Sequence, residues 1–148
     1  MIYTDKTNKA IKLCYKAHAG QVDKSGLPYV HHPLHLAEQM DDEVSTIVAL
    51  LHDVVEDTDY TLEDLEQMDF SDDVIEAIRL MTHDDSVPYF DYVREIARNP
   101  IATKVKLADL AHNSDLSRLD HEPTEIDLER VRKYQKAREI LLDGIESR

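Results

Sequence analysis

The sequence predicts an all-α protein, and three observations support this fold class. Apolar residues recur at spacings of three and four along most of the 148 residues, which is the period of a helix that buries one face. Strict alternation of apolar and polar residues, the pattern of a half-buried strand, is missing. Glycine is scarce, with three residues, although the turns of all-β folds consume many. We therefore expect a bundle of about eight helices in a single domain over residues 1–148.

The first two helices are predicted from capping and breaking residues. The hydroxyl of Thr4 can cap a helix that Gly20 should end. Residues 21–31 contain a glycine and a proline and should form a loop. Pro33 suits the first turn of the next helix, because the fixed φ of proline is already helical.

The third helix is the most apolar and should be central and mostly buried. It covers residues 44–51, and we expect it to continue to Asp57. Each later helix has a signal at its first turn, such as a hydroxyl cap or a proline. The expected starts are Thr61, Ser71, Pro88, Pro100 and a position near Asp127.

Composition excludes several classes of protein. The net charge of −14 argues against nonspecific binding to nucleic acid, which requires basic residues to neutralise phosphates. No apolar run is long enough to cross a bilayer, and the N-terminus lacks the layout of a signal peptide. The single cysteine excludes an internal disulfide and a cysteine-based zinc site. We expect a cytoplasmic protein that binds neither nucleic acid nor membranes.

Four side chains form a candidate metal site. Asp53 follows His52 at the end of the apolar helix, where a charged carboxylate is costly unless it is paired. Asp109 interrupts a second apolar helix in the same way, and His32 directly precedes a helix start. Two imidazoles and two carboxylates suit manganese or iron, with cobalt or zinc also compatible. For His52 and Asp53 alone, the alternative is a solvated acidic helix end.

Two further acids lie beside this candidate site. If the helix continues to Asp57, then Glu56 and Asp57 share one arc of its surface with His52 and Asp53. A bound ion lowers the pKa of a water ligand and draws charge from a phosphoryl oxygen, and the two acids can orient that water or move its proton. The sequence therefore indicates a metal-dependent phosphohydrolase.

Three segments carry a resemblance to a known family. They read GQVDKSGLPYVHHP at residues 20–33, LLHDVVEDT at 50–58 and VKLADLAHN at 105–113. In this order and spacing, they resemble the HD-type hydrolase domain of the Rel/Spo alarmone enzymes, and the stand-alone small alarmone hydrolases most of all. The resemblance extends from about Ala10 to Arg118, while the last helix is more generic.

The resemblance implies a fold, a reaction and a set of roles. The fold is the HD-type helical bundle, and the reaction is manganese-dependent hydrolysis of the 3′-pyrophosphate of guanosine tetra- or pentaphosphate to GDP or GTP and pyrophosphate. The implied roles are His32, His52, Asp53 and Asp109 as metal ligands, Glu56 and Asp57 as the catalytic acid pair, and Lys24, Ser25 and Asn113 as contacts to the phosphorylated nucleotide.

Two departures from the family bear on the substrate. The family enzymes commonly have Arg before the loop Lys, where this chain has Asp23, and a basic residue and Thr soon after the Asn, where this chain has Asp115 and Leu116. The base pocket must therefore differ. Two alternatives follow: an HD-type phosphatase acting on another nucleotide, or a regulatory domain that binds a nucleotide without turnover. Glu56 and Asp57 argue against the second alternative. The native metal and the oligomeric state stay open.

Other polar residues have weaker interpretations. His18 is expected to be a hydrogen-bonded core residue, and His112 either supports the ion site by orienting Asp109 or simply packs. The basic residues that could form a phosphate-binding patch, or equally a solvated face, are Lys104, Lys106 and Arg118.

Overall fold

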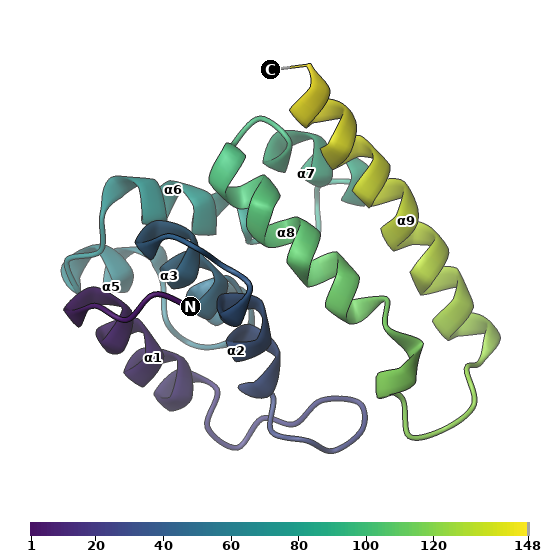
Figure 1. Ribbon diagram of the computed structural model, residues 1–148, viewed down its shortest axis with the longest axis horizontal. Coiled ribbons are helices and arrows are strands. Elements are labelled where there is room, and N and C mark those ends of the chain that lie inside the picture. The colour runs from purple at the N-terminus through teal and green to yellow at the C-terminus, as the bar shows by residue number, and fades with distance from the viewer. Residues whose placement is uncertain (148) are drawn as a thin grey trace.

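The computed structural model describes residues 1–147, and helices make up nearly all of the regular structure there (Figure 1). Among these residues there is no β-strand, only an isolated antiparallel bridge between Val22 and Pro28. The helices are α1 (Asp5–Ala17), α2 (His31–Glu38), α3 (Glu43–Leu51), α4 (Val54–Asp57), α5 (Leu62–Gln67), α6 (Asp72–Met81), α7 (Tyr89–Ile96), α8 (Pro100–Asn113), the short 3-10 helix η1 (Leu116–Arg118) and α9 (Glu125–Glu146). The all-α prediction is confirmed, with α4 a single turn beside eight longer α-helices in the described part.

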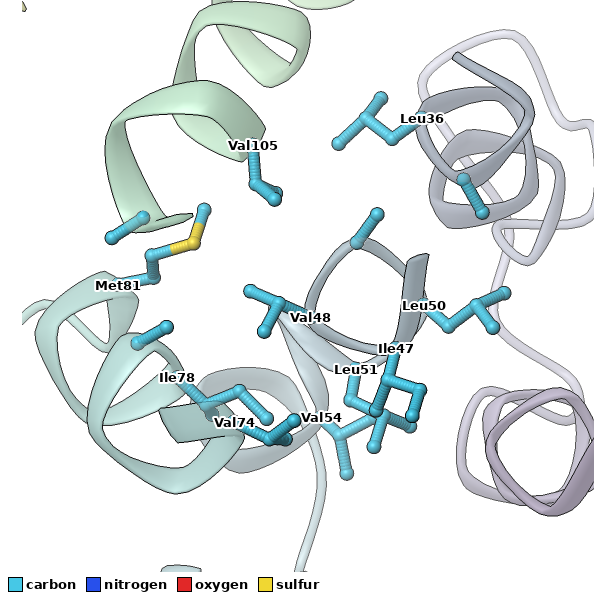
Figure 2. Packing of buried hydrophobic residues seen from close by; sticks show 14 of the residues in the cluster. Leu36, Ile47, Val48, Leu50, Leu51, Val54, Val74, Ile78, Met81 and Val105 are labelled. Carbon is cyan, nitrogen blue, oxygen red and sulfur yellow. The ribbon is translucent and has the colours of Figure 1, made fainter. Parts of the chain in front are cut away.

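Helix α3 lies at the centre of the bundle. It packs against α1, α2, α6 and α8, and every residue from Ser45 to Leu51 is buried. A helix that is apolar on all sides is stable only when other elements surround it, so the composition of this segment dictates its place. Figure 2 shows Val48, Leu50 and Leu51 projecting from it in different directions into the surrounding helices.

Most helix starts agree with the prediction. Oγ1 of Thr4, Oγ1 of Thr61 and Oγ of Ser71 each accept a hydrogen bond from the first turn of the following helix. Two starts differ by two residues. Helix α2 begins at His31 rather than Pro33, and α9 begins after Thr124, because the Asp127 carboxylate accepts a hydrogen bond from the Thr124 backbone and so belongs to the capping box of that helix.

The prediction that the third helix continues to Asp57 is wrong. Helix α3 ends at Leu51, His52 and Asp53 form a turn, and α4 then resumes as one turn. Asp53 has φ −104° and ψ 0°, outside the helical range. Successive residues of an unbroken helix point about 100° apart, so the turn provides a physical reason: it allows both side chains to face the same point.

The C-terminal helix and one loop complete the structure around α8. Helix α9 packs on α7 and α8, and Figure 1 shows it lying beside α8 along much of its length. The loop between α1 and α2 extends toward η1, where Oγ of Ser25 donates a hydrogen bond to the carbonyl oxygen of Arg118 at 2.9 Å. In the described part of the chain, no helix combines the length and the apolar character that crossing a membrane requires.

Candidate active site

The structure brings all four predicted metal ligands together. His32 comes from α2, His52 and Asp53 from the turn after α3, and Asp109 from α8. Nε2 of His32 lies 2.8 Å from Oδ1 of Asp109. Nε2 of His52 lies 3.1 Å from Oδ2 of Asp53 and 3.6 Å from Oδ1 of Asp109. One ligand atom each of His32, His52 and Asp109 therefore lies within 4.8 Å of the others at a buried point, and Asp53 joins this group through its contact with His52.

The orientation of His52 fits a bound cation. Its Nδ1–H donates to the carbonyl oxygen of Ala49 at 2.7 Å, so Nε2 is the ring nitrogen that can bind a cation once it has given up its proton. Nε2 is buried and has no hydrogen-bond partner within the described residues, although carboxylates lie around it. A buried polar atom without a partner requires an explanation, and a divalent cation that accepts nitrogen and oxygen ligands supplies one.

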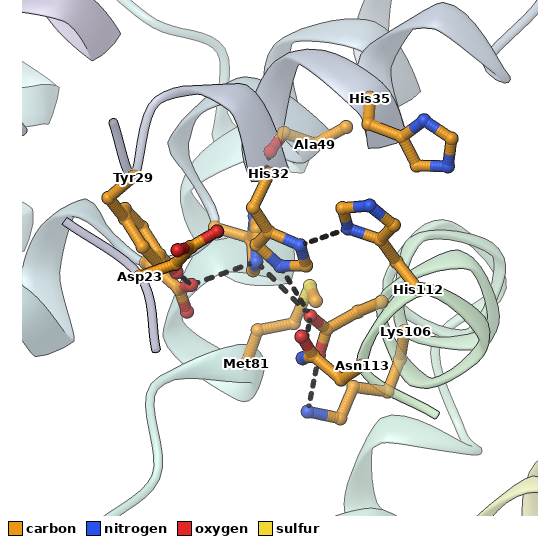
Figure 3. A network of polar contacts seen from close by, with 12 residues as sticks. Asp23, Tyr29, His32, His35, Ala49, Met81, Lys106, His112 and Asn113 are labelled. Carbon is orange, nitrogen blue, oxygen red and sulfur yellow. Dashed lines mark hydrogen bonds and ion pairs between the residues drawn. The ribbon is translucent and has the colours of Figure 1, made fainter. Parts of the chain in front are cut away.

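His112 holds the second imidazole. Nδ1 of His32 lies 2.7 Å from Nδ1 of His112, while Nε2 of His32 faces Asp109 (Figure 3). Burial lowers the pKa of His112 to about 3, and the nearby Arg118 contributes, so its ring is neutral and can accept the His32 proton. A hydrogen bond on the remote nitrogen is usual for metal-binding histidines. His112 thus orients His32, and not Asp109 as one interpretation of the sequence had it.

Asp109 has two partners on its own helix. Nζ of Lys106 donates to Oδ2 at 2.9 Å, and Nδ2 of Asn113 donates to Oδ1 at 3.0 Å (Figure 3). Burial by itself raises the pKa of Asp109, but the Lys106 ammonium and the two histidines outweigh it and hold this pKa well below its usual range. Lys106 is a site residue that the sequence analysis did not assign. Its spacing of three from Asp109 on an apolar helix was the available signal.

Tyr29 supports Asp53. Its hydroxyl donates to Oδ2 of Asp53. Burial alone raises the pKa of the Asp53 carboxyl, but His52 and the Tyr29 hydrogen bond lower it to about 2. The sequence analysis assigned no role to Tyr29, because nothing in its position three residues before His32 reveals a partner in the turn after α3.

The acid pair lies next to the metal ligands. One oxygen each of Asp53, Glu56 and Asp57 lies within 4.8 Å of the others, so the expected grouping holds despite the break in the helix. Oε1 of Glu56 accepts a hydrogen bond from the His83 backbone at 2.7 Å. Burial raises the pKa of both Glu56 and Asp57, and the Asp53 carboxylate adds to each shift. Carboxyl groups with raised pKa values are suited to proton transfer near neutral pH.

Two adjoining hollows open at this centre. The first, which we call the reaction pocket, has a volume of about 530 Å³ and is lined by five carboxylates, together with Lys106 and several tyrosines. The second, the side cleft, has a volume of about 360 Å³ and lies between the α1–α2 loop, η1 and α9. Asn113 and Tyr134 line both, so the two hollows lie next to each other.

The side cleft contains the three predicted substrate contacts, Lys24, Ser25 and Asn113. It also contains Arg118 and Arg130. Lys24 and Arg130 both line the cleft, and the pKa of Lys24 is lowered, first by burial and then by Arg130. Of the two possibilities for Lys104, Lys106 and Arg118, the shared basic patch does not form. Lys104 pairs instead with Asp41 and Asp42, Lys106 lines the reaction pocket, and Arg118 lines the side cleft.

Comparison with known proteins identifies relatives of this chain. The HD-domain family model matches residues 10–133. A GTP pyrophosphokinase of Streptomyces coelicolor is 36% identical over 146 residues, which cover 90% of this chain and 16% of that protein. The mouse protein MESH1, a guanosine-3′,5′-bis(diphosphate) 3′-pyrophosphohydrolase, is 36% identical over 124 residues, covering 76% of this chain and 68% of MESH1.

A solved structure gives the same result for the fold. A metazoan orthologue of SpoT, described as hydrolysing ppGpp, superimposes with a TM-score of 0.72 at 29% identity, covering 97% of this chain and 87% of that one. The present chain spans about one sixth of the length of the Streptomyces relative.

Proposed function

The chain belongs to the HD-domain family, and from that premise we propose that it is a metal-dependent hydrolase that removes the 3′-pyrophosphate from guanosine tetra- or pentaphosphate. The observation that carries this proposal is the convergence of His32, His52, Asp53 and Asp109 next to the acid pair Glu56 and Asp57. The names of MESH1 and of the metazoan SpoT orthologue describe the same activity and support it.

Each group of site residues has its own role in the proposed hydrolysis. His32, His52, Asp53 and Asp109 would hold a divalent cation, which supplies a lowered pKa for a bound water and Lewis acidity toward a phosphoryl oxygen. Glu56 and Asp57, whose pKa values are raised, accept and return the proton of the attacking water. Lys24, Ser25 and Asn113 contact the nucleotide from the side cleft. We propose manganese as the ion, since the mixed nitrogen and oxygen donor set suits it; iron, cobalt and zinc are the alternatives.

The substrate is tested by incubating the manganese-loaded protein with a panel of phosphorylated nucleotides and measuring pyrophosphate and phosphate separately. We expect pyrophosphate from guanosine tetraphosphate, and loss of turnover with a chelator that manganese restores. Release of phosphate from a different nucleotide supports the second candidate, an HD-type phosphatase, which Asp23 and Asp115 in the side cleft favour.

The ligand assignment is tested by Asp53→Ala, which should lose both the bound metal and all turnover. Elemental analysis and the pyrophosphate assay measure the two effects, and activity retained with an empty site would refute the assignment. The regulatory alternative is tested by the double variant Glu56→Gln with Asp57→Asn. Nucleotide affinity kept while turnover is abolished supports an enzyme, because a binding domain has no turnover to lose.

A further inference from the structure

Three side chains join the two walls of the side cleft. Nη2 of Arg118 lies 3.8 Å from Oδ2 of Asp23, and the Ser25 hydroxyl donates to the Arg118 carbonyl oxygen at 2.9 Å. Nη1 of Arg118 donates to the carbonyl oxygen of His112 at 2.8 Å. We call Asp23, Ser25 and Arg118 the clamp. It ties the α1–α2 loop to η1 across more than ninety residues of sequence.

The contacts within the clamp affect which part of the Arg118 guanidinium is available to a ligand. One terminal nitrogen of its guanidinium donates to the His112 carbonyl oxygen, and the other lies 3.8 Å from the Asp23 carboxylate, beyond hydrogen-bond distance. The residue lines the side cleft, and its side chain is 26% exposed. A guanidinium that binds a phosphate does so with its edge, through two parallel N–H groups. The Asp23 carboxylate beside that edge repels an anion, so the planar face is the better surface for an uncharged group.

The rest of the side cleft also suits a planar group. Val22 and Leu119 supply aliphatic surface, and Tyr134 supplies an aromatic ring. The reaction pocket also contains tyrosines but has no aliphatic lining residue, and five carboxylates and Lys106 dominate it. A phosphate gains nothing from aliphatic walls, whereas a heterocyclic base is stabilised by them and by stacking on a guanidinium.

We propose that Arg118 is the base-binding residue of the side cleft, with its planar face against the nucleobase of a nucleotide whose phosphates extend toward the reaction pocket. The inference rests on the proposed function and adds the residue that contacts the base. Asp23 is a positioning residue, because it acts through Arg118. The same Asp23 carboxylate also accepts hydrogen bonds at Oδ1 from the backbones of Ser25 and Leu27, at 2.9 and 3.0 Å.

The test compares two ligands on the manganese-loaded protein. Binding of GDP, which has a base, and of inorganic pyrophosphate, which has none, is measured by calorimetry. Arg118→Ala should weaken GDP binding by about 10-fold or more, since stacking on one base contributes roughly 1–3 kcal/mol. Its affinity for pyrophosphate should change less than about 2-fold, because the Asp23 carboxylate beside the guanidinium edge opposes the binding of an anion there. The matched control is Arg79→Ala on α6, an exposed arginine paired with Glu76, which should alter neither affinity.

Two further variants separate base binding from mere support of the fold. Arg118→Lys keeps the charge and a donor for the His112 carbonyl but has no plane, so it should preserve the melting temperature and still lose most of the GDP affinity. Asp23→Asn keeps the acceptor for the loop turn but loses the charge that faces Arg118. It should weaken GDP binding about 2- to 5-fold, the range of a part-exposed ion pair. Combined with Arg118→Ala, it should add nothing further.

Each contrary result has a definite meaning. Equal weakening of GDP and pyrophosphate by Arg118→Ala would show that Arg118 binds phosphate and would overturn the proposal. Unchanged GDP binding, full GDP binding by Arg118→Lys, or a wild-type protein that does not bind GDP would also overturn it. Additive effects in the double variant would remove the role of Asp23. The proposed reaction fails separately, if guanosine tetraphosphate releases no pyrophosphate while the GDP series behaves as described.

Discussion

The metal centre and the side cleft share Asn113, yet they are held in different ways. The ligands of the metal centre come from α2, α8 and the turn after α3, all of which pack on the central core, and protein partners hold the ligands in place. The side cleft is formed largely by a loop, a 3-10 turn and part of α9, with part-exposed side chains. The metal ligands are thus held by packed helices. The residues proposed to bind the nucleotide lie largely on segments whose sequence can change with little effect on the stability of the core.

The largest effect is expected from a change at Asp109, which tests whether the metal centre is held as rigidly as the comparison with the side cleft implies. Asp109→Ala should abolish metal binding and reduce turnover by at least about 1000-fold, since the ion supplies most of the charge stabilisation. It should also destabilise the protein by about 3–5 kcal/mol, because Lys106 is left buried without its carboxylate. Asp109→Asn should lose activity equally but unfold at a higher temperature than Asp109→Ala. Metal analysis and thermal unfolding measure both effects, and a stable, active Ala variant would contradict the contrast.

A smaller effect is expected at Lys106, which holds a ligand without being one. Lys106→Met keeps the length of the side chain beside Tyr92 and removes the charge from Oδ2 of Asp109. Metal affinity and turnover should fall about 10- to 100-fold, the usual effect of removing a partner of a metal ligand. The matched control, Lys104→Met on the same helix, removes an exposed pair with Asp41 and Asp42 and should leave both quantities unchanged. Equal effects of the two variants would show that metal affinity and turnover depend on the net charge of α8 and not on the contact between Lys106 and Asp109.

Replacing Glu56 should change both the turnover and the stability of the protein. Glu56→Gln should lower turnover by about 100-fold or more, the contribution typical of a positioned acid or base, while keeping the acceptor for the His83 backbone. Its pKa is raised in the folded protein, so the folded state binds its proton more tightly than the unfolded state. The ionised side chain therefore destabilises the fold above this pKa, and the penalty disappears as the pH falls below the ordinary value for Glu.

The chelated Gln variant should accordingly be more stable than the wild type at pH 7, with a difference that shrinks on acidification. Urea unfolding at several pH values measures this trend. If the stability difference between the two proteins stayed constant across the pH range, it would not arise from the raised pKa of Glu56.

The smallest expected effect lies in the side cleft, at Asp115. Its Oδ1 accepts the Ser117 backbone N–H at 3.0 Å, and Asn can keep that bond through its own oxygen. Asp115→Asn removes one exposed negative charge from the cleft, so GDP should bind about 2- to 5-fold more tightly, as for an exposed charge pair. Stability should be unchanged. Weaker binding would show that Asp115 itself contacts the ligand.

The metal centre was predictable because its signals are local. Charged residues inside apolar helices, such as Asp53 and Asp109, are costly without a partner, and this mismatch is visible in the sequence. The caps at Thr4, Thr61 and Ser71 are local for the same reason, and the all-α fold follows from the helical period. The ligand, catalytic and substrate roles, together with the cytoplasmic location and the single-domain organisation, remain predictions.

The missed features depend on contacts between distant segments. Tyr29 meets Asp53 only once α2 packs on α3, and Arg130 and Tyr134 reach the side cleft only through the packing of α9 on α8. The break after Leu51 was missed because no proline or glycine marks it. The break allows the adjacent side chains of His52 and Asp53 to face one point. Helical propensities contain no information about such a tertiary requirement.

His112 connects the two regions through separate parts of one residue. Its ring faces His32, and its carbonyl oxygen receives the Arg118 guanidinium. The first contact demands an imidazole, whereas the second uses an atom that every amino acid possesses. The contact with Arg118 therefore places no demand on the side chain at position 112, so the wall of the cleft can change during evolution without disturbing the hydrogen bond that holds His32.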